Sequence, residues 1–232
     1  MPDVLGVLLR RCGWRLPTGA RAAATALRPA AVSRPAAMTR PAAVIATPRL
    51  TLRELVFDDA PFVLRLLNDP TFLRYIGDRG VRDLDDARRY IQRGMLDSYA
   101  QHGFGLWLVE LPGPPSQPIG LCGLVSREGL PAPDIGFAFL PAWWSRGYAH
   151  EAAAAVMAHA RRVVGLERVL AIASPHNDGS LRLLHKLGFH YERDVLMPGD
   201  AEAVALFACE TAAPATRAMA GVDEAPEAGR SG

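Results

Sequence analysis

The feature that most constrains this fold is a buried strand that leads through a tight turn directly into a helix. The sequence DIGFAFL at 134–140 is apolar after its first residue, and PAWWSRG then leads into YAHEAAAAV. A short apolar run, a turn with glycine and an Ala-rich segment together predict a strand, a turn and a long helix. Such a unit places a helix N-terminus at the end of a strand, as layered α/β folds do.

The first turn of this helix is a candidate anion site. Amides at a helix N-terminus have no partner within the helix and lie at the positive end of its dipole. Arg146 adds a positive charge, and Gly147 would let a phosphate approach the backbone, although a glycine at such a junction also occurs for structural reasons alone. A P-loop needs Lys after its glycines, but the only Lys is Lys186. A three-glycine dinucleotide fingerprint is missing too, so both of those folds are excluded.

Hydrophobic periodicity predicts the other elements in the order strand, two helices, three strands, helix, strand, helix and two strands. The order favours an α/β layered fold with a mixed sheet. The predicted strands cover 47–55, 104–111, 119–127, 134–140, 167–175, 189–196 and 203–210. The predicted helices cover 58–67, 83–95, 148–165 and 177–188, with one helical turn at 68–77.

Composition divides the chain into three parts. Residues 1–47 are rich in Ala, Arg and Pro without apolar periodicity, and we expect them to be disordered or foreign to the fold. This leader is either a mitochondrial transit peptide or upstream sequence before a true start at Met38. It lacks the apolar stretch of a secretory signal. Residues 48–210 form the predicted domain, and residues 211–232 a disordered polar tail.

Charge and cysteine content exclude several functions. The net charge is +2, but residues 1–48 carry seven Arg and one Asp, which leaves −4 (2 − 6) for the remainder. The domain is therefore mildly acidic, and no nucleic-acid partner is predicted. No apolar run reaches membrane-spanning length, so we expect no membrane partner and a cytoplasmic location, or the mitochondrial matrix if the leader is a transit peptide. Cys12, Cys122 and Cys209 lack metal-ligand spacing, which favours small buried side chains and no metal.

Three motifs together carry a family resemblance. They are TPRLTLRELVFDDAPFVLRLLND at the start of the domain, IGFAFLPAWWSRGYAHEA in its middle and NDGSLRLLHKLGF near its end. In this order and separation they resemble the GNAT superfamily of acetyl-CoA-dependent N-acetyltransferases. The branch that includes the ribosomal-protein alanine N-terminal acetyltransferases is the most similar. The resemblance covers roughly residues 47–210 and implies a GNAT fold with a mixed, mostly antiparallel sheet flanked by helices.

The resemblance also implies a cofactor site. Acetyl-CoA would be the co-substrate, with its pyrophosphate at the helix N-terminus and its pantetheine arm along the strand from Ile135 to Leu140. Asn177 would contact it from the far side. The residues expected to bind it are Phe139, Leu140, Arg146, Gly147, Tyr148, Ala149, His150 and Asn177.

Catalytic roles are open at two positions. Asp134 stands where the family often carries its general base, and a solvated Asp at a loop end is the alternative. Ser180 matches a position that resembles a proton donor to the CoA sulfur, and a helix-start Ser bonded to nearby backbone is its alternative. The Tyr that often acts as general acid is replaced by Leu184, which leaves the acid unassigned.

These observations predict direct acetyl transfer to an amine within a ternary complex. A protein N-terminal amine is the first expected acceptor, and a small-molecule amine such as an aminoglycoside, polyamine or amino acid is the second. The missing Tyr keeps a third possibility open, a CoA-binding module without turnover. We expect the acceptor to approach from the side of residues 58–101 and of the loop after the strand at 119–127.

Overall fold

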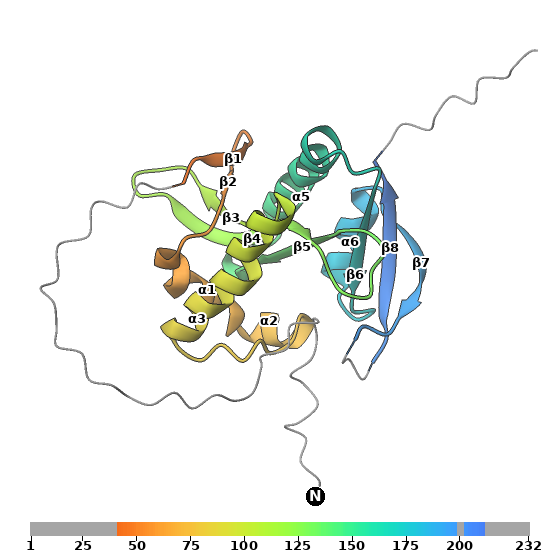
Figure 1. Ribbon diagram of the computed structural model, residues 1–232, viewed down its shortest axis with the longest axis horizontal. Helices are drawn as coiled ribbons and strands as arrows, with labels where there is room; N and C mark the ends of the chain where they lie inside the picture. The colour runs from red at the N-terminus through yellow and green to blue at the C-terminus, as the bar shows by residue number, and fades with distance from the viewer. Residues whose placement is uncertain (1–40, 199–201, 212–232) are drawn as a thin grey trace, which may run out of the picture.

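An eight-stranded mixed sheet runs through the protein in the order β1-β2-β3-β4-β5-β6-β8-β7 (Figure 1). The computed structural model describes residues 41–198 and 202–211, so Cys12, Met38, most of the predicted leader and nearly all of the predicted tail lie outside it. The strands are β1 (Ala43–Ala46), β2 (Thr51–Arg53), β3 (Leu106–Leu111), β4 (Gln117–Val125), β5 (Asp134–Phe139), β6 (Arg168–Ala173), β7 (His190–Val195) and β8 (Val204–Glu210).

Helices cover both faces of this sheet (Figure 1). The α-helices are α1 (Ala60–Leu67), α2 (Pro70–Tyr75), α3 (Leu84–Ile91), α4 (Asp97–His102), α5 (Tyr148–His159) and α6 (Asp178–Lys186). Short 3-10 turns form η1 (Phe57–Asp59) and η3 (Pro141–Trp143), and π turns form η2 (Gln92–Leu96) and η4 (Ala160–Val164). The predicted mixed, mostly antiparallel sheet flanked by helices is confirmed.

The sheet is split between β5 and β6. These two neighbours are parallel and share a single residue pair, Asp134 with Leu170, whereas the other neighbouring strands are antiparallel with longer registers. The amide of Leu170 also donates to the carbonyl of Pro133 at 2.9 Å. Beyond this point the strands diverge, so backbone groups along the facing edges of β5 and β6 have no ladder partner across the split.

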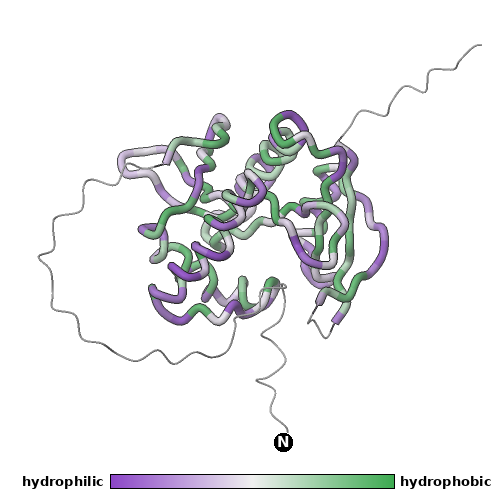
Figure 2. The backbone as a smooth tube through the Cα atoms, in the orientation of Figure 1, coloured by the Kyte–Doolittle hydropathy of each residue, from purple (hydrophilic) through white to green (hydrophobic). Residues whose placement is uncertain are grey.

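Two apolar cores lie on opposite faces of the sheet. One joins helices α1 to α3 to strand residues such as Leu108 and Leu121, and the other joins α5 and α6 to residues such as Trp107 and Cys122. Neighbouring residues of one strand point to opposite faces, which is why Trp107 and Leu108 belong to different cores. Figure 2 shows the apolar strands inside and the polar outer side of α3.

A buried ion network fixes the start of α1 against the sheet. Arg53 on β2 contacts Asp59 at 2.8 Å and Glu110 on β3 at 3.0 Å, and all three side chains are buried. Asp59 also accepts the amide of Val56 at 2.8 Å. Asp59 therefore stabilises η1 and binds Arg53, and α1 follows from Ala60.

The structure differs from the predicted elements at three strands. β1 lies within the predicted leader, and its pairing with β2 places the start of the fold before residue 48. Pro118 belongs to β4, although we assigned its segment to a loop; it pairs with Glu110 where the β3–β4 register shifts, which is where a strand tolerates proline. β8 inserts between β6 and β7, so β7 forms the edge of the sheet.

Candidate active site

The predicted anion site has the backbone geometry that such a site requires. Gly147 precedes α5 with φ +80°, and Ser145 has φ +59°, a conformation that residues other than glycine rarely adopt. The first amide of α5 that bonds back to the turn is that of Glu151, which donates to the carbonyl of Gly147 at 3.0 Å. The amides of Tyr148, Ala149 and His150 are therefore the helix-start donors that an anion could accept.

A side-chain clamp from the β1–β2 turn holds this loop. Both Nε and Nη2 of Arg49 lie 2.6 Å from Oε2 of Glu151, and Nη1 donates to the carbonyl of Arg146 at 3.1 Å. The guanidinium also stacks 4.7 Å from the centre of the Tyr148 ring. Thr47 adds a 2.6 Å hydrogen bond to the other oxygen of Glu151. The partners of Glu151 therefore come from the turn before β2 and not from its own helix.

The two tryptophans of the motif support the loop from below. Trp143 lies 6.1 Å from Tyr148 and 5.1 Å from the guanidinium of Arg146. The indole of Trp144 donates to the carbonyl of Phe139 at 2.7 Å. Both tryptophans therefore connect the loop to the residues on either side of it.

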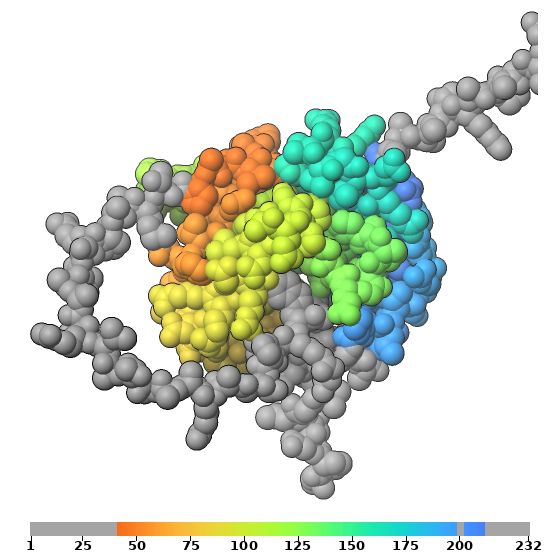
Figure 3. Space-filling model, in the orientation of Figure 1, coloured from red at the N-terminus to blue at the C-terminus, as the bar shows by residue number. Residues whose placement is uncertain are grey.

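A cavity of about 610 Å³ opens where β5 and β6 diverge. Figure 3 shows the α3–α4 segment in yellow facing the β4–β5 turn in green beside this region. The lining comes from α2, α3 and η2 on one side, from β5 and β6 at the split, and from the start of α6. Site residues predicted in two distant segments, Asp134 in one and Asn177 and Ser180 in the other, all line it.

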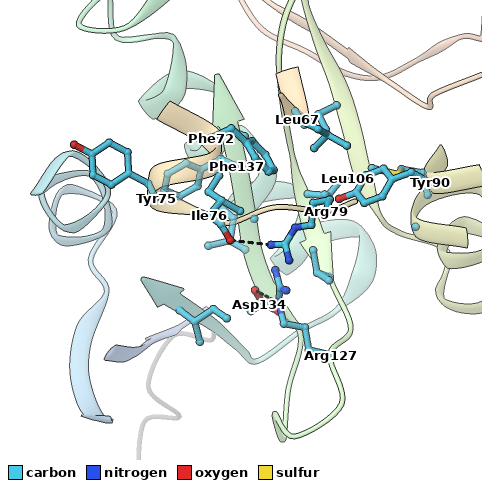
Figure 4. A pocket seen from close by; sticks show the side chains of 18 of the residues that line it. Leu67, Phe72, Tyr75, Ile76, Arg79, Tyr90, Leu106, Arg127, Asp134 and Phe137 are labelled. Carbon is cyan, nitrogen blue, oxygen red and sulfur yellow. Dashed lines mark hydrogen bonds and ion pairs between the residues drawn. The ribbon is translucent and has the colours of Figure 1, made fainter. Parts of the chain in front are cut away.

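Asp134 lies at the base of this cavity (Figure 4). Its side chain is 1% exposed, and both of its oxygens accept Nε of Arg127, at 2.8 and 2.9 Å. Burial raises the pKa of Asp134 above its ordinary value, and the charge and hydrogen bond of Arg127 oppose that rise without cancelling it. The solvated carboxylate that we kept as an alternative is therefore wrong, and a buried carboxyl of raised pKa suits a proton acceptor.

Asn177 and Ser180 form the start of α6. The side chain of Asn177 caps the helix and accepts the amide of Ser180 at 3.1 Å. Both residues are partly buried and line the cavity opposite β5. The local cap explains why an Asn begins this helix, and it leaves the Ser180 hydroxyl as a cavity-lining donor.

Phe139 and Leu140 contribute differently from the other strand residues. Their side chains are buried in the two cores, whereas Ile135, Gly136, Phe137 and Ala138 line the cavity. The amide of Leu140 donates to the carbonyl of Ile119 at 3.0 Å. A ligand along this strand would therefore contact the strand backbone and the cavity-lining side chains, and not the side chains of Phe139 and Leu140.

The anion site at the start of α5 and the split between β5 and β6 together suit an extended thioester that carries phosphates, such as acetyl-CoA. A Cβ added to Gly147 would point to the Nη2 of Arg49 at 3.3 Å, on the surface that an approaching phosphate would share. The split edge of β5 offers backbone partners to a pantetheine arm, which carries two amides. Within residues 41–198 and 202–211 no group of three His, Cys, Asp or Glu could hold a metal ion, and no helix has the length and apolar character needed to span a bilayer.

Comparison with known proteins decides the family. The model of the acetyltransferase (GNAT) domain matches residues 49–190, which include the loop, the split and the start of α6. This chain is a member of the GNAT acetyltransferases. A GNAT acetyltransferase of Bacillus anthracis is 25% identical, with a TM-score of 0.60 over 72% of this chain and 98% of that one.

Two further relatives match a similar share of this chain and most of their own length. The protein YkkB of Bacillus subtilis is 28% identical over 154 residues, which is 65% of this chain and 87% of its own. RimL, a ribosomal-protein alpha-N-acetyltransferase solved with coenzyme A, is 17% identical with a TM-score of 0.62 over 73% of this chain and 98% of its own. At that identity RimL shows the GNAT fold only.

Sequence reasoning missed several residues of this GNAT site. Arg127 follows β4 in a turn, and Arg79 lies between α2 and α3, where its Nη2 donates to the carbonyl of Ile76 at 3.3 Å (Figure 4). Both line the cavity with Asp134. The one available signal was the expectation that the acceptor approaches from residues 58–101, which include Arg79, and from the loop after the predicted strand at 119–127, which ends at Arg127.

Proposed function

We propose that this protein transfers the acetyl group of acetyl-CoA to a primary amine in a ternary complex, with a protein N-terminal amine as its first acceptor. The observation that carries the proposal is the buried Asp134 at the base of a cavity that opens between β5 and β6. The family uses acetyl-CoA, and the α5 loop lies at the far end of β5 from Asp134. The proposed cofactor site and the proposed acceptor site therefore lie at opposite ends of β5.

The chain's own residues would divide the binding of the cofactor. The amides of Tyr148, Ala149 and His150, with Arg146 beside them, would hold the pyrophosphate through charge-assisted hydrogen bonds. The backbone of the β5 segment that includes Phe139 and Leu140 would orient the pantetheine arm, with Asn177 across the split. Acetyl-CoA, when bound, supplies the activated acetyl group.

Proton transfer would use two groups in the cavity. An N-terminal amine has a pKa of about 7.7–8.0, so near neutral pH it arrives protonated and must lose a proton to attack. Asp134 would accept that proton, and its raised pKa suits this role. Ser180, on the opposite wall, would donate a proton to the departing thiolate in place of the tyrosine that Leu184 replaces.

Structural neighbours support more than one acceptor. Besides RimL, they include a spermidine N-acetyltransferase chimera, 17% identical with a TM-score of 0.57, and an aminoglycoside acetyltransferase solved with coenzyme A, 18% identical with a TM-score of 0.57. A small-molecule amine is therefore the second candidate. The non-enzymatic alternative is a protein that binds CoA without turnover.

An acceptor panel tests the proposal. The full chain is incubated with acetyl-CoA and peptides with free N-termini, polyamines, aminoglycosides or amino acids, while free thiol is measured and products are weighed for one added acetyl group. Peptide products support the first acceptor, and small-amine products the second. Saturable binding of CoA with no thiol release from any acceptor would show a binding module.

A further inference from the structure

The acceptor side of the cavity is rich in arginine. The described residues that line the cavity include four arginines and three aspartates. They are Arg79, Arg89, Arg93 and Arg127, and Asp78, Asp86 and Asp134. The arginines come from α3, η2 and neighbouring loops, and the aspartates come from α3, the loop before it and β5.

Most of these charges are compensated. Arg127 pairs with Asp134, Arg89 pairs with Asp86, and Asp78 pairs with Arg82, which is outside the lining. Among the residues that the structure describes, Arg93 has no ion pair. Arg93 is also exposed, whereas Asp134 is buried. The cavity thus has a carboxylate at its base and an unneutralised guanidinium at its rim.

Arg93 also marks where the cavity continues outward. A second, smaller cavity of about 190 Å³ shares Arg93, Ser98, Val125 and Arg127 with the first. An acceptor whose amine reaches Asp134 would extend between η2 and the β4–β5 turn and pass the Arg93 side chain. Substituents that the acceptor extends outward from its amine would therefore meet a guanidinium, which binds carboxylates with two N–H donors.

We propose that the acceptor carries a carboxylate near its reactive amine and that Arg93 binds this carboxylate. The inference rests on the proposed acetyl transfer and narrows its acceptor class. The carboxylate can belong to an acidic residue that follows the N-terminus of a peptide, or to a free amino acid. A polycationic amine has no carboxylate for Arg93 and would bring ammonium groups beside that guanidinium. We therefore expect it to be the poorer acceptor, although Asp97 and Glu128 also line this outer cavity.

The test compares acceptors that differ only in the carboxylate. Acetylation is measured for the peptide Ala-Asp-Ala-Ala amide against Ala-Asn-Ala-Ala amide, for alanine against alaninamide, and for spermidine. Each is measured with the full chain and with Arg93→Gln. The ratio of variant to parent kcat/KM is taken for each acceptor, so differences in amine pKa cancel. Arg88→Gln on α3 is the matched control, because Arg88 pairs with Asp85 and does not line the cavity.

The expected result is a loss of about tenfold in kcat/KM for the carboxylate member of one pair in Arg93→Gln, with no change for its amide partner. The pair that responds identifies the source of the carboxylate. Equal ratios for all acceptors, or a preference for spermidine, would overturn the inference and leave acetyl transfer intact. Absence of transfer to every acceptor would instead overturn the proposed function, and the inference with it.

Discussion

Arg49 and Glu151 lie 102 residues apart in the chain and form an ion pair in which two guanidinium nitrogens approach one carboxylate oxygen at 2.6 Å. The pair connects the β1–β2 turn to the first turn of α5. Burial acts to raise the pKa of Glu151, but the hydrogen bonds of Thr47 and Arg49 outweigh it and hold the pKa below its ordinary value. The carboxylate therefore stays charged, and the loop stays clamped, throughout the neutral pH range.

Arg49→Gln should raise the KM for acetyl-CoA about fivefold and change kcat little. The Arg49 side chain is 48% exposed, so about 1 kcal/mol is expected from the lost clamp. Steady-state kinetics with acetyl-CoA as the varied substrate measure the effect, and Arg162→Gln on the exposed end of η4 is the control. Glu151→Gln should give a similar rise, and the double variant less than the sum. If the effects of the two substitutions on KM were additive, the Arg49–Glu151 pair would not contribute to acetyl-CoA binding.

Gly147→Ala should weaken CoA binding at least tenfold. Alanine at φ +80° costs about 1–2 kcal/mol of folding stability, and its Cβ would lie 3.3 Å from Nη2 of Arg49, beside the helix start that is proposed to bind the phosphates. Gly165→Ala is a matched control, because Gly165 ends the same helical segment at φ +78° with no atom within 4 Å of an added Cβ. Both variants should lose similar stability in thermal denaturation, while calorimetry shows lost CoA affinity for Gly147→Ala alone. Equal CoA affinities would place the phosphates elsewhere.

Asp134→Asn should reduce kcat/KM by about 10²–10⁴-fold at pH 6.5–7. Asparagine has the size of aspartate but cannot accept the amine proton. The defect should shrink as the pH rises above the acceptor amine's own pKa, because that amine then arrives neutral. A pH profile of the variant and the parent checks this. A loss that is uniform across pH would instead assign Asp134 to holding Arg127 and the β5–β6 junction.

Arg127→Gln should move the acid limb of the kcat/KM profile to higher pH. Burial raises the pKa of Asp134 and Arg127 lowers it, so removing Arg127 raises that pKa further and delays formation of the carboxylate. Arg89→Gln removes another cavity-lining arginine that pairs with Asp86, and its acid limb should stay in place. An unmoved limb in Arg127→Gln would mean that the limb reports another group.

Arg53→Met should lower the free energy of unfolding by about 3–5 kcal/mol, because it leaves two buried carboxylates without their cation. Arg82→Met is the matched surface control. Its side chain is 58% exposed, and loss of its pair with Asp78 should cost about 0–1 kcal/mol. Chemical denaturation of the three proteins measures both differences. Similar losses in the two variants would contradict the stabilising role of the buried network.

Local patterns accounted for much of this fold before any coordinates. The turn at Gly147 and the helix start at Asn177 were predictable, because their backbone and capping requirements involve residues close in the chain. β1 was missed because its residues are half-buried or exposed on a sheet edge, where few apolar side chains reveal a strand. The central position of β8 depends on strand pairing, which periodicity does not encode.

The site was less predictable than the fold. Arg127 is seven residues from Asp134, and their contact depends on the β4–β5 turn reversing the chain. Arg49 reaches Glu151 only after β2 and α5 have packed on the same part of the structure. Such pairs depend on how the chain folds back on itself, so the family resemblance could suggest Asp134 but not the cation that lowers its pKa.

Because β5 and β6 share a single residue pair, packing against α5 helps to hold the two halves of the sheet together. A single apolar core contains residues of both halves, such as Trp107 and Phe207, together with the small buried face of that helix. This face consists of Ala152, Ala153, Val156 and Ala160. Small side chains let the helix axis lie close to both halves of the sheet. The size of these four side chains would therefore influence the width of the opening that is proposed to receive the thioester, although none of the four lines the cavity.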